Sequence, residues 1–283
     1  MEVRRIGVLG AGTMGGEIVF VATQAGIPVT MKDIEQKYLD AGIEKVKQIY
    51  SFKVKRRRMS QEEMDQKLGL VQTTLDYAPF EDVDFVIEAV PENLELKRKV
   101  FRELEQVCKP GAILASNTSA LSISRIAEAT TCAERIIGMH FFNPVSMMRL
   151  VEVIAGEQTG TEIVEKTCSL SEQIGKTPVK CSDSAGFIVN RLLCAAMREA
   201  VRCEREGLLT REEIDNALVK PDAGLPTGLF KMADQLGIDL LYRVMSILEE
   251  AFGERFSVPP EISELYNKGE FGIKSGKGFY NYG

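Results

Sequence analysis

The sequence predicts an α/β protein in which a doubly wound, mainly parallel sheet is followed by a second, all-helical domain. In the N-terminal part, short apolar runs alternate with segments whose apolar residues recur at helical spacing, which is typical of repeated βα units. The run at 84–90 is almost wholly apolar, as expected for a strand that helices cover on both faces. After residue 182 only helical spacing continues, interrupted by Gly and Pro.

Apolar periodicity and turn residues place the individual elements. Strands are expected at 3–9, 27–33, 84–90, 112–116, 135–140 and 150–154. Among the helices between them, one starts near Met14 and stops at Gly26, and a long amphipathic one continues through the basic residues at 53–58. Ser60 and Glu63 form a capping box that opens a further helix, and others are expected at 94–107 and 122–129.

The second domain is expected to contain helices at 187–206, 211–219, 228–235, 239–252 and 261–267. The polar stretch at 181–185 separates it from the alternating part of the chain. The domain boundaries are therefore predicted as 1–184 and 185–283.

Composition excludes several classes of protein. The chain has 283 residues and a formal net charge of −6, which disfavours nucleic-acid binding. Its single histidine and its six cysteines, which lack CxxC spacing, argue against a metal site. The cysteines are instead expected as free thiols in a reducing cytoplasm. The N-terminus is broken by charges and glycines, so we expect neither a signal peptide nor a membrane span.

A glycine-rich turn indicates a Rossmann-type dinucleotide site. Gly10, Gly12 and Gly15 form GxGxxG between a strand and a helix, where such a turn lets a pyrophosphate approach the backbone and the helix amides. Asp33 ends the next strand, 18 residues beyond Gly15. A carboxylate there accepts from ribose hydroxyls and repels a 2′-phosphate, so NAD is favoured over NADP, although Lys32 beside it weakens this preference.

His140 is the candidate proton carrier. It ends one apolar strand, and a second strand begins at Leu150. If the two strands pair antiparallel about a turn centred on Ser146, Glu152 lies directly opposite His140, with Cβ atoms about 5 Å apart. A glutamate in this position would fix the imidazole tautomer and stabilise the imidazolium, as a general base for alcohol oxidation requires.

Three further features each have a functional and a purely structural interpretation. The segment 116–119 follows a strand end, where ligands bind in open α/β sheets, but it also suits a helix-capping loop. Asn190 lies inside an expected helix, where it either faces solvent or contributes to a functional site. The basic cluster of Lys53, Lys55 and 56–58 is either a solvated helix end or a binding site for a phosphorylated ligand.

Taken together, the chain resembles the L-3-hydroxyacyl-CoA dehydrogenase family, especially its bacterial 3-hydroxybutyryl-CoA dehydrogenases. The resemblance extends over essentially the whole length and rests on seven ordered blocks: GAGTMG at 10–15, EAVPENLELK at 88–97, ASNTSALSIS at 115–124, GMHFFNPV at 138–145, LVEVI at 150–154, GFIVNRL at 186–192 and KSGKGFYNY at 274–282.

The resemblance implies roles for individual residues. His140 matches the catalytic base, Glu152 its acidic partner, and Ser119 and Asn190 the residues that hold the reacting oxygen. The positions implied to contact NAD are Gly10, Ala11, Gly12, Thr13, Met14, Gly15, Asp33, Glu92, Lys97, Asn117, Ser119, Asn143 and Lys274. Lys53, with Arg56 of the same cluster, falls where coenzyme A is contacted.

The implied reaction is hydride transfer between NAD and C3 of a 3-hydroxyacyl-CoA, with a homodimer formed through the helical domain. One departure is visible at 226–231, where relatives usually show Pro-Met-Gly-Pro followed by an acidic residue. This difference concerns the acyl-chain preference and the shape of the substrate cleft rather than the chemistry.

Two other functions remain open. The first is a dehydrogenase of the same architecture that acts on a free hydroxy acid or sugar acid, which would not need the cations around Lys53. The second is a non-catalytic dinucleotide-binding or lens-crystallin-like structural protein, which would bind NAD without turnover.

Overall fold

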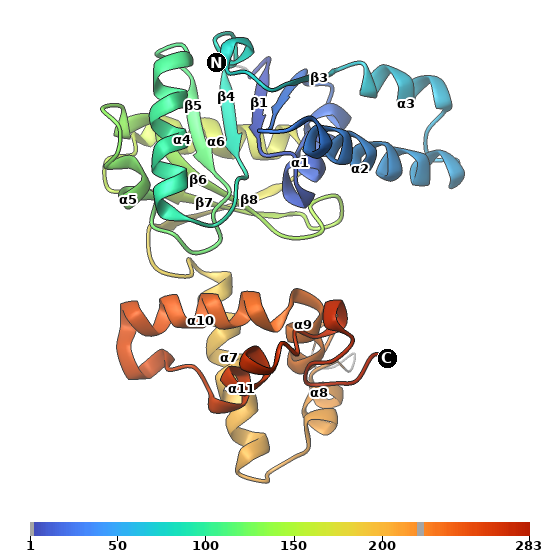
Figure 1. Ribbon diagram of the computed structural model, residues 1–283, viewed down its shortest axis with the longest axis vertical. Coiled ribbons are helices and arrows are strands. Elements are labelled where there is room, and N and C mark those ends of the chain that lie inside the picture. Colours follow the sequence, from blue (N-terminus) through green and yellow to red (C-terminus); the bar gives the residue numbers. More distant parts are fainter. Residues whose placement is uncertain (1–2, 220–223) are drawn as a thin grey trace. The chain divides into compact units, whose positions relative to one another are not determined.

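The computed structural model describes residues 3–219 and 224–283. The chain forms two compact units, Met1–Ser184 and Ala185–Gly283, called here the N-terminal and helical units (Figure 1). Across the described ranges, no helix combines the length and the apolar character needed to cross a membrane.

The N-terminal unit is built on an eight-stranded sheet in the order β3-β2-β1-β4-β5-β6-β7-β8. Neighbouring strands are parallel except for the antiparallel pair β6 and β7. The strands are β1 (Ile6–Leu9), β2 (Val29–Lys32), β3 (Val71–Thr74), β4 (Phe85–Glu88), β5 (Ile113–Ser116), β6 (Ile136–Phe141), β7 (Leu150–Ala155) and β8 (Thr177–Ser182). The helices are α1 (Thr13–Gln24), α2 (Gln36–Lys55), α3 (Gln61–Leu68), α4 (Leu94–Val107), α5 (Ile123–Ala127) and α6 (Thr161–Gln173), with 3-10 turns η1 (Ala78–Phe80) and η2 (Ala133–Arg135).

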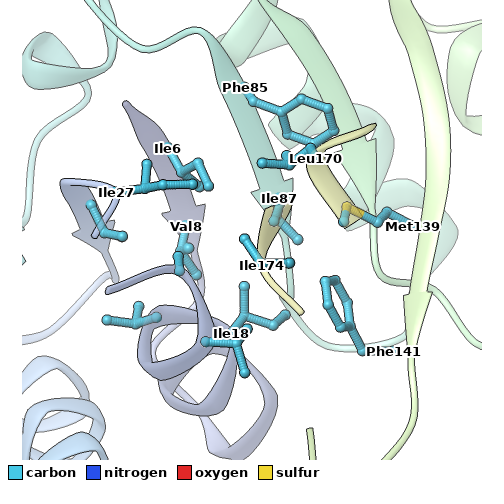
Figure 2. Packing of buried hydrophobic residues seen from close by; sticks show 14 of the residues in the cluster. Ile6, Val8, Ile18, Ile27, Phe85, Ile87, Met139, Phe141, Leu170 and Ile174 are labelled. Carbon is cyan, nitrogen blue, oxygen red and sulfur yellow. The ribbon is translucent and has the colours of Figure 1, made fainter. Parts of the chain in front are cut away.

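The main core lies between one face of the sheet and the helices α1, α2 and α6. Figure 2 shows Ile87 of β4 and Phe141 of β6 with Ile18 of α1 and Leu170 of α6, all of them buried. Because side chains alternate along a strand, Val86 and Leu114 point to the opposite face, on the side of α4 and α5 (Figure 1). Helices on both faces explain why the central strands are apolar throughout, and the predicted doubly wound α/β class is confirmed.

The sheet gathers the segments of interest at one edge. The register pairs Leu9 with Lys32 and with Glu88, and Glu88 with Ser116, so these parallel strands end together. The strand order reverses between β1 and β4, which is the point where open α/β sheets bind ligands.

The glycines of the turn between β1 and α1 differ in whether the fold requires them. Gly10 has φ +100°, and a Cβ there would lie 2.6 Å from the carbonyl oxygen of Ala89. A Cβ on Gly15 would lie only 1.8 Å from the carbonyl oxygen of Gly10. Gly12 differs, since an added Cβ would have no protein atom within 4 Å. The fold itself therefore requires Gly10 and Gly15 but not Gly12.

The region around α2 and α3 confirms one expectation and corrects another. Ser60 and Glu63 form the predicted capping box, in which each side chain accepts from the backbone N–H of the other residue. The preceding helix was expected to continue through the basic cluster, but α2 ends at Lys55. Arg57 then takes φ 55°, a conformation that interrupts the helix before α3 begins.

Three elements were not foreseen from the sequence, namely β3, α6 and β8. Strand β3 has the sequence VQTT, and β8 has TPVKCS, so neither has an apolar run. Both lie at the ends of the strand order, where one side of the strand has no neighbour in the sheet. Edge strands bury little surface, so their apolar pattern is weak.

The helical unit contains five α-helices over its described residues: α7 (Val189–Arg205), α8 (Arg211–Val219), α9 (Leu229–Leu236), α10 (Ile238–Phe252) and α11 (Pro260–Lys268), with 3-10 turns η3 (Gly253–Phe256) and η4 (Ile273–Ser275). Their bounds agree with the predicted helices to within two residues. Two buried carboxylates organise the unit. Asp215 accepts from the amides of Phe230 and Lys231, and Asp234 accepts from those of Phe279 and Tyr280.

The glycine turn provides a matched test of the fold. Gly15→Ala places a methyl group against a backbone oxygen, so we expect it to cost about 3 kcal/mol or more and to lower the melting temperature by about 6 °C or more. Gly12→Ala, with open space at its Cβ, is expected to melt within about 2 °C of the wild type. Thermal unfolding followed by circular dichroism compares the two. Equal melting temperatures would contradict the close approach at Gly15.

Candidate active site

The buried pair of His140 and Glu152 lies at the centre of the candidate site. Strands β6 and β7 pair antiparallel with His140 directly opposite Glu152, which is the predicted register. The imidazole Nδ1 lies 2.8 Å from the carboxylate Oε2, and the two side chains are 6% and 1% exposed. An ionised carboxylate can only accept a hydrogen bond, so Nδ1 carries the proton and the neutral ring has its lone pair on Nε2. The pair is therefore arranged for proton uptake at Nε2.

Asn117 fixes the neighbouring backbone. Its side-chain Oδ1 accepts from the N–H of Phe141 at 2.9 Å, and its own N–H donates to the carbonyl of Glu88 at 2.8 Å. Asn117 thus ties the end of β6 to the ends of β4 and β5. The ring of Phe142 lies against the imidazole, with centroids 4.6 Å apart. His140 is therefore held at its Nδ1 and at one face of its ring, and the backbone N–H that follows it is held by Asn117.

The β1–α1 turn has the features of a dinucleotide site. Helix α1 begins at Thr13 without a side-chain N-cap, and its first turn carries no acidic side chain that would oppose an anion at the helix N-terminus. The open space at Gly12 leaves room for a group to approach the backbone. Asp33 accepts from the N–H of Ala11 through Oδ2 at 2.7 Å, which fixes its carboxylate beside the turn. These residues fit NAD.

Lys32 was expected to weaken the preference for NAD over NADP. In the structure it is buried, and its ammonium lies 4.2 Å from the ring centroid of Tyr77. The ring holds this cation by a cation–π contact. We therefore no longer expect Lys32 to weaken the preference for NAD over NADP.

Glu92 and the segment 117–119 form a second polar cluster. Oε1 of Glu92 accepts from the hydroxyl of Thr118 at 2.6 Å and from the N–H of Ser119 at 2.8 Å. Its Oε2 lies 3.4 Å from the ammonium of Lys97. The structure therefore brings together three predicted cofactor positions, Glu92, Lys97 and Ser119.

Lys97 also belongs to a buried network that the sequence did not reveal. Its ammonium donates to Glu88 at 2.6 Å and to the carbonyl of Val90, and it is 1% exposed. Glu88, which is fully buried, also accepts from the hydroxyl of Ser116 at 2.6 Å. In the sequence, Glu88 stands out only as a charge at the end of an apolar strand and as the first residue of the block at 88–97.

The basic cluster splits into two parts. Lys53 is turned toward α1, where its ammonium donates to Gln24 and lies 5.4 Å from the ring centroid of Phe20. Burial, followed by the charges of Arg58 and Lys67, lowers the pKa of Lys53. Arg56 stacks on Phe52 at 5.1 Å and is exposed. Within this cluster, Lys55 and the arginines at 56–58 are exposed.

The remaining predicted positions lie in loops or in the helical unit. Asn143 is exposed in the loop between β6 and β7. Asn190 lies in the first turn of α7, and the ammonium of Lys274 pairs with Asp239. In the divergent segment 226–231, a Cβ on Gly228 would lie 2.2 Å from Cγ of Asp215, so this glycine is required by packing.

The thiols and acidic groups were compared with the requirements of a metal centre. Within residues 3–219 and 224–283, no group of three or more His, Cys, Asp or Glu side chains is arranged to hold an ion. All six cysteines are free, and four of them are buried. Burial, together with the charges of Glu152 and Asp183, raises the pKa of the Cys181 thiol to about 12, so this thiol is not a nucleophile.

Comparison with protein families covers nearly the whole chain. Residues 5–184 match the 3-hydroxyacyl-CoA dehydrogenase NAD binding domain, and residues 186–282 match the 3-hydroxyacyl-CoA dehydrogenase C-terminal domain. The two matches meet near the division between the two structural units.

Solved structures agree with the family models. The (S)-3-hydroxybutyryl-CoA dehydrogenase of Ralstonia eutropha is 35% identical with a TM-score of 0.95, and each chain is covered completely. FadB2 of M. tuberculosis gives the same identity, TM-score and coverage. The 3-hydroxybutyryl-CoA dehydrogenase of Escherichia coli is 37% identical with a TM-score of 0.95; all of this chain and 60% of that longer chain are covered.

The fold, the glycine-rich turn with Asp33 and the two family matches lead to one conclusion. The chain belongs to the 3-hydroxyacyl-CoA dehydrogenase family and is an NAD-dependent oxidoreductase.

Proposed function

We propose that this protein interconverts 3-hydroxybutyryl-CoA and acetoacetyl-CoA, using NAD as the hydride carrier. The observation that carries the proposal is the buried contact of 2.8 Å between His140 and Glu152 at the end of β6. The full-length similarity to 3-hydroxybutyryl-CoA dehydrogenases supports a short acyl chain. The family also supports a cytoplasmic homodimer formed through the helical unit.

His140 transfers the proton in this mechanism. Nε2 takes the proton of the substrate hydroxyl while Nδ1 keeps its hydrogen bond to Glu152. The imidazolium then forms beside a buried carboxylate, where the low dielectric strengthens the attraction between the two charges. In the reverse direction His140 returns the same proton. Ser119 and Asn190 are proposed to hydrogen-bond the reacting oxygen and to fix its orientation.

NAD, when bound, supplies the acceptor for the hydride that leaves C3 of the thioester. The chain would hold it through the turn at 10–15 and through Asp33, whose carboxylate suits a ribose diol. Glu92, Asn117, Asn143 and Lys274 are proposed as further contacts. Lys97 is better suited to orient Val90 and Glu92 than to contact NAD, since its ammonium is already bonded to protein groups.

The exposed cations at the end of α2 support a coenzyme A ester as substrate. Lys55 and the arginines at 56–58 offer charge to phosphate groups, which a free hydroxy acid lacks. Since Lys53 is turned toward Gln24, we assign the phosphate contacts to Arg56 and its neighbours, with Lys53 supporting the helix beneath them.

The proposal predicts both a substrate preference and the role of His140. The wild type is expected to oxidise NADH with acetoacetyl-CoA and to be nearly inactive with free acetoacetate. His140→Gln is expected to lower kcat by about a hundredfold or more, because a general base contributes that much to proton transfer. The loss of NADH absorbance measures both rates.

A control separates catalysis from binding. His140→Gln should bind NADH as the wild type does, because the glycine-rich turn at 10–15 follows β1, whereas His140 lies in β6. Near-normal turnover in this variant would remove His140 as the proton carrier. Equal rates with free acetoacetate would favour a hydroxy-acid dehydrogenase, and NADH binding without turnover on either substrate would favour a structural protein.

Asp33 determines the choice between cofactors in this account. Asp33→Asn keeps an acceptor oxygen for the N–H of Ala11 but loses the charge that repels a 2′-phosphate. We expect the ratio of kcat/KM for NADH to that for NADPH to fall by about tenfold or more, equivalent to about 1.4 kcal/mol. Parallel assays with the two cofactors test this, and an unchanged ratio would contradict the role of Asp33.

A further inference from the structure

A buried carboxylate in α1 has no part in the mechanism described so far. Glu17 lies in the second turn of the helix that follows the glycine-rich turn, and it is 2% exposed. Its Oε2 accepts from the N–H of Ser146 at 2.9 Å, and its Oε1 lies 3.5 Å from the ammonium of Lys45 in α2. Burying a charge is costly unless partners compensate it, so this arrangement is a specific one.

Ser146 belongs to the loop at 142–149, which joins β6 to β7. This loop starts two residues after His140 and carries Asn143. Asn143, Pro144 and Met147 are exposed, whereas Val145 is buried in the main core. Val145 therefore anchors the loop in the core, and polar contacts to the loop backbone add to this anchor.

Lys176 holds the same loop from a second side. It precedes β8 and is buried, and its ammonium donates to the carbonyl of Val145 and, at 2.8 Å, to that of Met148. Burial lowers the pKa of Lys176, while the charge of Glu17 acts in the opposite direction. Two buried, opposite charges thus bind three backbone groups of one loop, between Val145 and Met148.

We propose that Glu17 and Lys176 are positioning residues that hold the loop at 142–149 against α1. The helix that begins at the nucleotide turn and the loop that carries Asn143 are thereby fixed relative to each other. The inference rests on the proposed function, because it assigns Asn143 to the bound cofactor. It adds that cofactor affinity depends on a carboxylate and an ammonium that do not touch the cofactor.

The test compares variants of equal size. Glu17→Met removes both polar contacts, whereas Glu17→Gln keeps an acceptor for Ser146. Lys176→Met keeps the apolar stem and loses both carbonyl contacts. Thr23→Val is the matched control, since Thr23 is buried in the same helix and bonds to Tyr50 rather than to the loop.

We expect Glu17→Met and Lys176→Met each to raise the NADH dissociation constant and the KM for NADH by about tenfold, equivalent to about 1.4 kcal/mol of binding free energy, because the loop that carries Asn143 is displaced. The KM for acetoacetyl-CoA should change less than about twofold, and Glu17→Gln should lie within about threefold of the wild type. Thr23→Val should lower the melting temperature without changing NADH affinity.

NADH fluorescence gives the dissociation constant without a thioester substrate, so an inactive wild type would refute the proposed function but leave this test intact. Unchanged NADH affinity in both methionine variants would overturn the inference. An equal loss of affinity in Thr23→Val would also overturn it, because general destabilisation would then explain the effect.

Discussion

The antiparallel pairing of β6 with β7 is the constraint on which the site depends. In an otherwise parallel sheet, this one reversal sets His140 opposite Glu152 and buries both side chains. A carboxylate removed from water would be strongly unfavourable alone, and an imidazole beside it gives it a partner. The same contact fixes which nitrogen carries the proton. The register of β6 against β7 therefore determines both the burial of His140 with Glu152 and the proposed proton chemistry.

Buried charges recur along the carboxyl edge of the sheet. Glu88 is compensated by Lys97 and Ser116, Glu152 by His140, and Glu17 by Ser146 and Lys45. Each of these carboxylates holds a side chain or a backbone group in place. Such networks hold a geometry when all their groups are satisfied, and removing one partner leaves an unpaired buried charge. We therefore regard them as the framework that holds the loops of this edge in place.

The sequence predicted best those elements that combine an apolar pattern with residues of known chemistry. The sequence predicted that His140 faces Glu152 on the assumption of a turn centred on Ser146, and the register of β6 and β7 agrees with that assumption. The helix at Leu94–Val107 was predicted to the residue from its apolar face. Strands β3 and β8 could not be predicted, since edge strands carry weak apolar patterns. The partners of Glu17 and Glu88 lie up to 129 residues away, and local spacing does not encode such contacts.

The most direct measurement of the central claim uses the fact that the chain has one histidine. Nitrogen NMR of the imidazole reports a single pair of ring signals, and these signals distinguish the two neutral tautomers. The account predicts the Nδ1–H form for the neutral ring of the wild type, and a mixture of tautomers in Glu152→Gln. A wild-type ring protonated on Nε2 when neutral, or a tautomer unaffected by Glu152→Gln, would contradict it.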